Sequence, residues 1–407
     1  MAAAKRRTAP RPGEGESIYA HIVGWGMAAP ERIMTNQDLS AFIDTTDEWI
    51  VSRTGIRERH IASDKETTAT LGLKAAQAAL DIADILPTEI DLIICATSTP
   101  EYIFPSTASL IQAWLGASTS GAFDLSAACS GFVYAVDMAT QAIKSGSIRT
   151  AVVIGTETFS RILDWTDRGT CILFGDGAGA VVLTASSVEG GVLSSVLRSD
   201  GSGGDLLGVP SVGSIDISSI PTLKESHKMG KMFMNGGEVF KFATRVIGES
   251  ITQALDIAGL TIADLKAIVP HQANIRIIQA AARSLKVDES IFVCNMDRYA
   301  NTSAASIPIA LVEAVQQGRI KPGDNIAFVG FGGGLSWAAM VVKWGVPPPE
   351  ERGRVLSRQR RQVLYRVAWW RVLLGRTLRQ INDVINRIRP ERGRMERLRR
   401  NYDRSER

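Results

Sequence analysis

FGDGAGAVVL at residues 174–183 and FGGGLSWAAMVV at residues 331–342 each join a glycine-rich turn to a strand of small and β-branched residues. Each stretch closes a half of the chain that also contains an apolar strand with a polar end. These strands read DLIICATST at 91–99 and LKAIVPHQAN at 265–274. Two halves with the same order of elements indicate a duplicated α/β unit.

Short apolar runs alternate with helical stretches from about residue 18 to residue 345. The strand-like runs are rich in Ile and Val and are bounded by Gly, Pro or Asp, which is typical of buried strands. They lie at 91–98, 151–157, 178–184, 265–271, 325–331 and 338–344. The helical stretches lie at 70–83, 130–146, 238–259 and 305–318. This alternation predicts a layered α/β architecture.

The charge of the chain is unevenly distributed. The 407 residues carry a net charge of +4, but residues 347–407 alone hold 18 Arg, no Lys and seven acidic residues. That segment is therefore +11, which leaves −7 for residues 1–346. A basic isoelectric point that belongs to one segment does not make the whole chain a nucleic-acid binder.

The cysteines and the N-terminal segment predict a reducing, cytoplasmic setting. The four cysteines have no CxxC pair and no metal-ligand spacing, so we expect no metal site. Cys95, Cys171 and Cys294 lie in apolar runs, where a buried thiol is expected. Residues 1–16 contain no apolar signal sequence and are interpreted as a polar, disordered leader.

Cys129 differs from the other cysteines because it lies where a strand-like segment passes into an amphipathic helix, in DLSAACSGFVYAVDMA at 124–139. The first turn of a helix has unpaired N–H groups, whose partial positive charge favours a thiolate. Small neighbours leave room for a substrate carbonyl, and the N–H of Cys129 could help to hold an oxyanion. From the residues alone, a core cysteine at a helix start explains the pattern equally well.

Three further features could take part in chemistry. His271 ends a strand and opens a polar turn, a position at which sites form in α/β proteins, although a single His is more often structural. Asn301 precedes a helix, and a capping role explains it better when it is taken alone. Gly332, Gly333 and Gly334 could present backbone N–H groups to an oxyanion. They lead into a strand and not into a helix, so they do not form a dinucleotide-binding motif.

Seven segments in collinear order carry a more specific signal. They are DEWIVSRTGIRERH (47–60), FPSTASLIQAWLG (104–116), AACSGF (127–132), DRGTCILFGDGAGA (167–180), HQANIRII (271–278), NTSAASIP (301–308) and GFGGGLSW (330–337). Together they resemble β-ketoacyl-acyl-carrier-protein synthase III over roughly residues 18–345.

The resemblance implies a thiolase fold that works as a homodimer, with duplicated halves in an α-β-α-β-α arrangement. It implies that an acyl-CoA acylates Cys129, and that malonyl-acyl carrier protein then loses carbon dioxide and attacks the thioester. His271 and Asn301 would bind the malonyl thioester carbonyl, and the glycine run would serve the oxyanion. No cofactor is implied, because acyl-CoA and the malonyl carrier are substrates. Both a relative acting in specialised metabolite synthesis and a non-catalytic acyl-binding scaffold remain as alternatives.

Further positions correspond by motif to the binding surfaces of the family. The resemblance places Trp49, Arg53 and Arg168 at the coenzyme A entrance, and Phe104 at the acyl pocket. For the acidic carrier protein, Arg276 matches a binding position. Lys241 with Arg245, and Arg276 with Arg283, are each spaced to share one helix face, although solvated surface charge explains the first pair equally well. Two departures concern the pocket: Gly237 stands where a larger residue is expected, and the 209–230 loop is long.

These patterns divide the chain into a leader (1–16), a half with the nucleophile (17–190), a half with His and Asn (191–346) and an Arg-rich extension (347–407). Within 358–389 of the extension, apolar residues recur at steps of three and four among arginines, which predicts a basic amphipathic helix. Such a helix suits an anionic membrane surface. Packing on the acidic body of the enzyme or on a neighbouring subunit explains it equally well, and nucleic acid ranks third.

Overall fold

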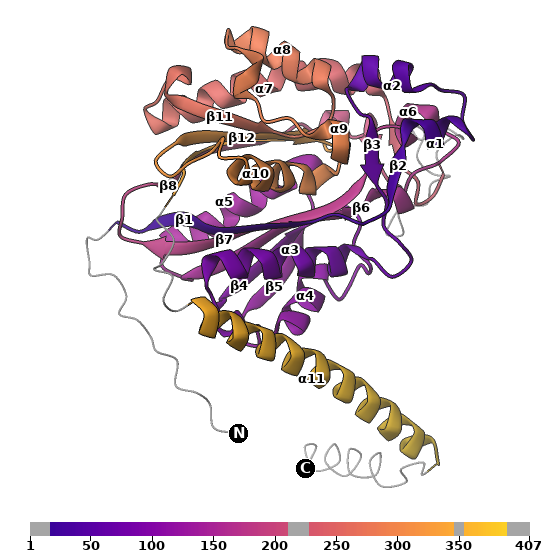
Figure 1. Ribbon diagram of the computed structural model, residues 1–407, viewed down its shortest axis with the longest axis vertical. Coiled ribbons are helices and arrows are strands. Elements are labelled where there is room, and N and C mark those ends of the chain that lie inside the picture. Colours follow the sequence, from indigo (N-terminus) through magenta and orange to yellow (C-terminus); the bar gives the residue numbers. More distant parts are fainter. Residues whose placement is uncertain (1–16, 211–227, 346–353, 389–407) are drawn as a thin grey trace, which may run out of the picture.

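The computed structural model describes residues 17–210, 228–345 and 354–388 (Figure 1). The predicted leader and most of the 209–230 loop lie outside these residues. Among the smaller elements are β2 (Ile33–Thr35), β3 (Glu58–His60), β9 (Leu207–Gly208), β10 (Phe233–Met234), α1 (Asn36–Ser40), α2 (Asp47–Thr54), α6 (Arg168–Cys171) and α9 (Met296–Tyr299).

Two sheets form the centre of the molecule. The first has five strands in the order β1 (Tyr19–Ala28), β7 (Asp176–Ser186), β6 (Thr150–Thr158), β4 (Leu92–Ala96) and β5 (Gly121–Leu125). The second has four strands in the order β11 (Leu265–Pro270), β12 (Asn325–Gly332), β13 (Ser336–Lys343) and β8 (Gly191–Ser199). Each sheet mixes parallel and antiparallel pairs, and each has a strand that follows a glycine-rich turn, β7 and β13.

Helices form three layers around the two sheets (Figure 1). Helices α3 (Thr68–Ala83) and α4 (Thr107–Leu115) cover the outer face of the first sheet. Helices α5 (Gly131–Lys144) and α10 (Ser306–Gln316) lie between the sheets, and α7 (Gly236–Ala258) and α8 (Ile275–Leu285) cover the second sheet. The α-β-α-β-α arrangement predicted from the sequence is confirmed.

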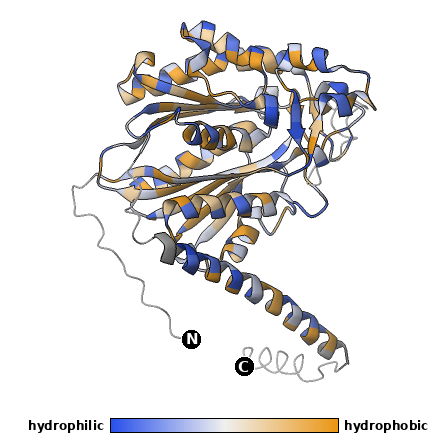
Figure 2. Cartoon of the chain, viewed as in Figure 1, coloured by the Kyte–Doolittle hydropathy of each residue, from blue (hydrophilic) through white to orange (hydrophobic). Residues whose placement is uncertain are grey.

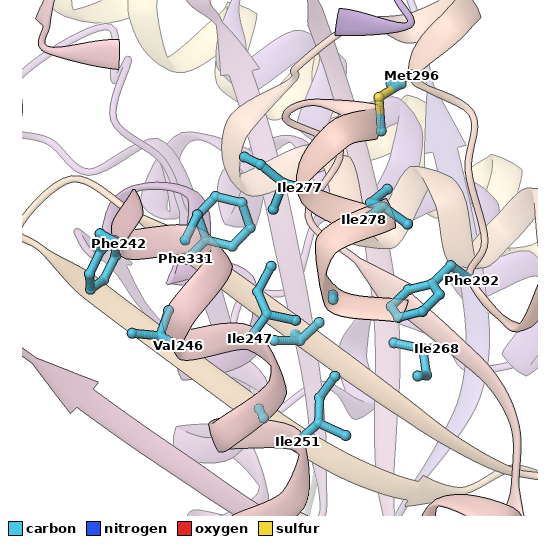
Figure 3. Close-up of a cluster of buried hydrophobic side chains, with 14 of the residues drawn as sticks. Phe242, Val246, Ile247, Ile251, Ile268, Ile277, Ile278, Phe292, Met296 and Phe331 are labelled. Atoms are coloured by element: carbon cyan, nitrogen blue, oxygen red, sulfur yellow. The ribbon is translucent and has the colours of Figure 1, made fainter. Parts of the chain in front are cut away.

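Burial follows this layering because each sheet presents two apolar faces. Helix α10 is buried from Ser306 to Ala314, as expected for a helix enclosed by two sheets. Helix α7 instead uses one stripe, which includes Phe242, Val246 and Ile251, to cover the outer side of the second sheet. These side chains meet Ile268 of β11 in a continuous cluster (Figure 3).

The six strands and four helices predicted from the sequence are confirmed to within a few residues. Strand β1 was not predicted, because its glycines interrupt the apolar pattern. A Cβ on Gly24 would lie 2.3 Å from the Ala79 carbonyl oxygen, and one on Gly26 would lie 2.4 Å from that of Ala75. Only glycine lets α3 pack this closely on β1, so these residues form a strand despite their weak strand propensity.

Helix α11 (Arg354–Ile388) lies below the first sheet, where its first turns cross α4 and the rest extends beyond the body (Figure 1). Among the described residues, none of the helices is both long enough and apolar enough to cross a membrane.

Candidate active site

A cavity of about 960 Å³ lies where the two halves of the chain meet. Its wall is formed by the turn between β5 and α5, the ends of β11 and β12, and the first turns of α7 and α8. Many of the residues selected from the sequence line it: Trp49, Arg53, Cys129, Gly237, Lys241, His271, Arg276, Asn301, Gly332, Gly333 and Gly334.

Cys129 lies in a 3-10 turn, Ala128–Ser130, that leads directly into α5. Ala128 has a φ of 45°, a left-handed conformation that a non-glycine residue adopts at a cost and that often marks a functional turn. On the other side, a Cβ on Gly332 would lie 2.8 Å from the backbone nitrogen of Cys129 and 3.2 Å from its sulfur. Glycine at 332 therefore allows the β12 backbone to approach the thiol.

The environment of Cys129 differs from the one expected from the sequence. Only 6% of the residue is exposed, and burial raises the pKa of its thiol to about 12, although a hydrogen bond to Ser303 acts in the opposite direction. Burial therefore opposes the effect expected of the helix start, because desolvation disfavours the charged form of the thiol. The resting group is a thiol, and its proton must be removed during acylation.

His271 is a neutral imidazole at the end of β11. It is 2% exposed, and burial lowers its pKa to about 3. Its Nδ1 lies 2.7 Å from the Ser306 hydroxyl oxygen, which is also 2.7 Å from the Ser303 carbonyl oxygen. The Ser306 hydroxyl donates its one proton to that carbonyl, so it accepts from the ring, and the imidazole proton is on Nδ1 in this arrangement.

Asn301 follows Ala300, which has a φ of 54°. The Asn301 Oδ1 accepts a hydrogen bond from the backbone N–H of Ser303 at 2.8 Å. Because this bond occupies the oxygen, the Nδ2 is the end of the amide that remains to donate. Asn301 thus stabilises a turn, but it is not the cap that the sequence suggested, because Thr302 and Ala305 are the N-cap residues of the two helices that follow. It is also among the residues that line the cavity.

Two further residues near the thiol were missed from the sequence. The Cys129 thiol donates to the Ser303 hydroxyl at 3.4 Å, and Ser303 lies close enough to Glu157 to favour the charged form of that carboxyl. Glu157 is fully buried at the end of β6, where it accepts from the Thr99 hydroxyl at 2.6 Å and from the Ser98 N–H at 3.1 Å. A single acidic residue in the apolar strand AVVIGTE was the available signal, since a buried carboxylate is rare without a partner.

The three side chains predicted for the coenzyme A entrance lie together. The Trp49 ring lies near two guanidinium groups, with the Arg53 Cζ at 4.9 Å and the Arg168 Cζ at 4.8 Å from its centroid. Lys241 pairs with Glu238 at 2.8 Å at the rim. Arg245 and Arg283 are exposed on the same helices as Lys241 and Arg276, but they are not among the residues that line the cavity.

The surroundings of Phe104, Gly237 and Cys294 bear on three further predictions. Phe104 is 84% exposed and does not line the cavity of its own chain, so it closes no acyl pocket within one subunit. At Gly237 a Cβ would meet only the Asn235 Oδ1 at 3.8 Å, so the wall has room there for a larger side chain. The prediction for Cys294 is wrong, because this residue is exposed, whereas Cys95 and Cys171 are buried as expected.

Comparison with known proteins gives a consistent result. Models of the C-terminal part of 3-oxoacyl-[acyl-carrier-protein (ACP)] synthase III and of 3-oxoacyl-[acyl-carrier-protein (ACP)] synthase III match residues 255–344 and 123–201. A β-ketoacyl-[acyl-carrier-protein] synthase III of Desulfitobacterium hafniense is 52% identical over 327 residues, which are 80% of this chain and 98% of the relative. This chain belongs to the synthase III family. A Roseiflexus member is 50% identical over 329 residues, with the same shares covered.

Solved structures of similar sequence have the same fold. The Aquifex aeolicus enzyme has a TM-score of 0.74 at 44% identity and covers 80% of this chain and 100% of its own. The priming β-ketosynthase of the R1128 polyketide pathway has a TM-score of 0.75 at 37% identity and covers 82% of this chain and 98% of its own. The thiolase fold is therefore confirmed, and the chain is a condensing acyltransferase of the synthase III type.

Proposed function

We propose that this synthase III starts fatty-acid synthesis by joining an acyl-CoA primer to malonyl-acyl carrier protein, with Cys129 as the acylated nucleophile. The observation that carries the assignment is the convergence of Cys129, His271 and Asn301 on one cavity from three separate segments of the chain. A sulfur at the start of α5 and beside the Gly332 backbone is accessible from the cavity, although it is shielded from bulk water.

His271 and Asn301 would stabilise the second half-reaction. Loss of carbon dioxide from the malonyl group develops negative charge on the thioester oxygen, and neutral donors stabilise it without removing a proton. The pKa of His271, which burial lowers to about 3, keeps the ring neutral at physiological pH. For Nε2 to donate, the Ser306 hydroxyl must turn from the Ser303 carbonyl to Nδ1, so we propose Ser306 as the residue that selects the productive tautomer.

The two substrates would use different parts of the entrance. Trp49 with Arg53 and Arg168 offers a flat ring and two cations to the nucleotide end of coenzyme A. Arg276, with Lys241, Arg245 and Arg283 as secondary contacts, would bind the acidic carrier protein. The N–H groups of Cys129 and of the run Gly332 to Gly334 would hold the oxyanion of acyl transfer. No cofactor is required by this chemistry.

We also propose that the enzyme is a cytoplasmic homodimer. The exposed apolar residues Tyr102, Ile103 and Phe104 lie together in the chain, and Phe123 on edge strand β5 is 42% exposed. An unpaired strand edge beside exposed apolar residues favours association with a second copy. Phe104, which lies outside its own cavity, would then complete the acyl pocket of the partner subunit. Residues 358–389 would add peripheral contact with a membrane surface.

The alternative substrate assignment is priming of a specialised metabolite, which the similarity to the R1128 ketosynthase favours. Mass spectrometry of the intact protein after incubation with acetyl-, branched and longer acyl-CoAs tests both assignments. We expect one acyl adduct, located on Cys129, and release of a 3-ketoacyl-carrier protein after malonyl-acyl carrier protein is added. The preferred acyl chain decides between the two assignments, and absence of any adduct would support a non-catalytic scaffold.

A further inference from the structure

Helix α11 has a docked face that fixes it to the body. Arg361 is 1% exposed, and its guanidinium contacts Asp81 at 2.8 Å and Asp84 at 2.6 Å, both near the end of α3. Ala368, two turns later, is also buried and lies against α4, since a Cβ on Gly116 would be 3.1 Å from its methyl group. Residues on the same side are at least partly buried: Leu364, Tyr365, Val372 and Gly375.

A second apolar stripe runs along the opposite face of α11. Its members are each between 47% and 60% exposed: Val363, Val367, Trp370, Leu374, Leu378 and Ile381. At about 100° per residue, steps of three and four place these side chains in one row roughly opposite Arg361 and Ala368. Apolar residues therefore occur along the part of the helix that extends past the body (Figure 2).

The arginines around this apolar stripe indicate which kind of partner binds it. Residues 354–388 hold nine arginines and one acidic residue, Asp383. Pairing with a second α11 would bring like charges together, which disfavours a coiled coil of two copies. A nucleic acid would neutralise the arginines but would leave the apolar stripe in water. A membrane surface with anionic headgroups satisfies both features, because the stripe enters the acyl boundary while the arginines contact phosphates.

We propose that α11 is a membrane-docking arm: the Arg361 face holds it on the enzyme, and the stripe from Val363 to Ile381 inserts into an anionic lipid surface. This deepens the peripheral membrane contact proposed above. Since the stripe faces away from the docked side, the catalytic body would lie above the membrane. The arm would therefore localise the enzyme without altering its active site.

Flotation of the full chain tests this proposal, with phosphatidylcholine vesicles that contain either no phosphatidylglycerol or roughly one part in three. We expect binding to the anionic vesicles only, and weaker binding at high salt. The variant Trp370→Glu/Leu374→Glu should reduce binding roughly tenfold or more. The matched control Gln362→Glu/Gln380→Glu adds the same charge at exposed positions of α11 outside the stripe, and should bind within about twofold of the native chain.

Two results would overturn the membrane arm. One is no binding of the native chain to anionic vesicles, and the other is equal binding by the stripe variant. Sedimentation of the same proteins distinguishes another occupant, because a change of oligomeric state in the stripe variant would identify a contact between copies. Condensing activity with soluble substrates should be unchanged in both variants, so failure of membrane binding is separable from failure of the enzymatic assignment.

A separate observation concerns the thiol proton. The Cys129 S–H donates to the Ser303 hydroxyl, and Ser303 lies close enough to Glu157 to favour the charged form of that carboxyl, so these side chains form a row from the nucleophile to a buried acid. Ser303 has a φ of 50°, a third non-glycine residue in the left-handed region beside the site. We infer that Glu157 is a positioning residue that holds the Cys129 proton, through Ser303, between the two half-reactions.

The proton that leaves the Cys129 thiol is returned to it within one catalytic cycle. During acylation the S–H bond of Cys129 breaks, a sulfur–acyl bond forms and coenzyme A leaves as a thiolate that takes a proton from solvent. The Cys129 proton passes to Ser303 while Ser303 passes its own to Glu157. During condensation the new C–C bond displaces the Cys129 sulfur, and the proton returns by the same path to reform the thiol. Burial lowers the pKa of His271 to about 3 and raises that of Glu157 to about 7, so Glu157 is the better matched base.

The pH profile of the acylation rate, followed by mass spectrometry with acetyl-CoA, tests this inference. The native rate should rise to a plateau through about pH 7, and Glu157→Gln should slow acylation at least roughly tenfold and remove that inflection. Ser303→Ala should remove the same inflection although Glu157 remains, and Glu157→Asp should restore part of the rate. An unchanged inflection in Ser303→Ala, checked for folding by thermal unfolding, would overturn the relay.

Discussion

The catalytic body and helix α11 differ in how they bury apolar residues. Helix α10 is covered by a sheet on both sides, whereas α11 is covered only along the face that contains Arg361 and Ala368. The body therefore buries its core within one chain, and its chemistry depends on a few polar groups at the edge of that core. Helix α11 has a second apolar face that is exposed, so we expect its function to depend on an external surface. The two regions should accordingly fail independently.

The largest expected effect is the loss of activity in Cys129→Ala. Removal of the nucleophile should lower condensation by roughly 10³-fold or more and abolish the acyl adduct. Vesicle binding through α11 should be unchanged. Cys294→Ala is the matched control, because it removes an exposed thiol from the same chain and should leave both measurements as they are. An acyl adduct that persists in Cys129→Ala would show that another residue is the nucleophile.

His271→Ala should separate the two half-reactions within the body. Loss of one donor to the developing oxyanion typically lowers the rate by about 10²–10³-fold. The acyl adduct on Cys129 should still form, because His271 does not carry the thiol proton in our assignment. Decarboxylation of malonyl-acyl carrier protein, measured as released carbon dioxide, should fall in parallel with condensation. A His271→Ala enzyme that no longer acylates would contradict that assignment.

Arg361→Ala should affect α11 and leave the body intact. Breaking a buried ion pair by removing one partner costs roughly 3 kcal/mol, because Asp81 and Asp84 lose their shared cation. Hydrogen exchange over residues 358–384 should accelerate by about 10²-fold, while exchange in α5 and α10 stays the same. Arg358→Ala is the control, since Arg358 is 68% exposed and lies 3.9 Å from Asp81. Equal exchange in the two variants would mean that Arg361 does not fix the arm.

The pH dependence of unfolding should report the buried carboxylate of the body. Burial raises the pKa of Glu157 to about 7, so the folded state binds more protons than the unfolded state between about pH 4.5 and 7. This group therefore stabilises the fold below that window and loses its contribution as the pH rises through it, by at most about 3 kcal/mol. Denaturant unfolding of native and Glu157→Gln protein should show a difference in stability that shrinks with increasing pH. A constant difference would contradict the raised pKa.

The fold was predictable because its signals are local and repeated. Ile- and Val-rich strands followed by helices determine the layers, and Cys129 could be selected because it lies at a strand-to-helix junction. The protonation of that thiol could not be predicted. It depends on burial by β12 and on a carboxylate from β6, which come from distant parts of the chain. Asn301 was selected only through the family resemblance, since its local pattern indicates no more than a cap.

Helix α11 could also be predicted from the sequence only in part. Its periodic apolar residues predicted an amphipathic helix, and a helix is found. The sequence cannot show which apolar face of this helix packs on the body, because the apolar residues recur at the same three- and four-residue steps in either case. The choice is made by Asp81 and Asp84, which lie about 280 residues earlier in the chain and bind Arg361. Membrane contact and packing on the body, which were alternatives in the sequence, can therefore belong to opposite faces of one helix.

The smallest expected effect is a selective loss of carrier binding, which completes the comparison between body and arm. Arg276→Glu should raise the KM for malonyl-acyl carrier protein by roughly tenfold, because it places a like charge before an acidic partner, while acylation by acyl-CoA continues. Arg149→Glu, an exposed change outside the cavity lining, controls for net charge. Equal loss in both half-reactions would show that Arg276 serves the cavity and not the carrier. If Arg276→Glu keeps vesicle binding and Trp370→Glu/Leu374→Glu keeps the carrier KM, the two charged surfaces bind two different anionic partners.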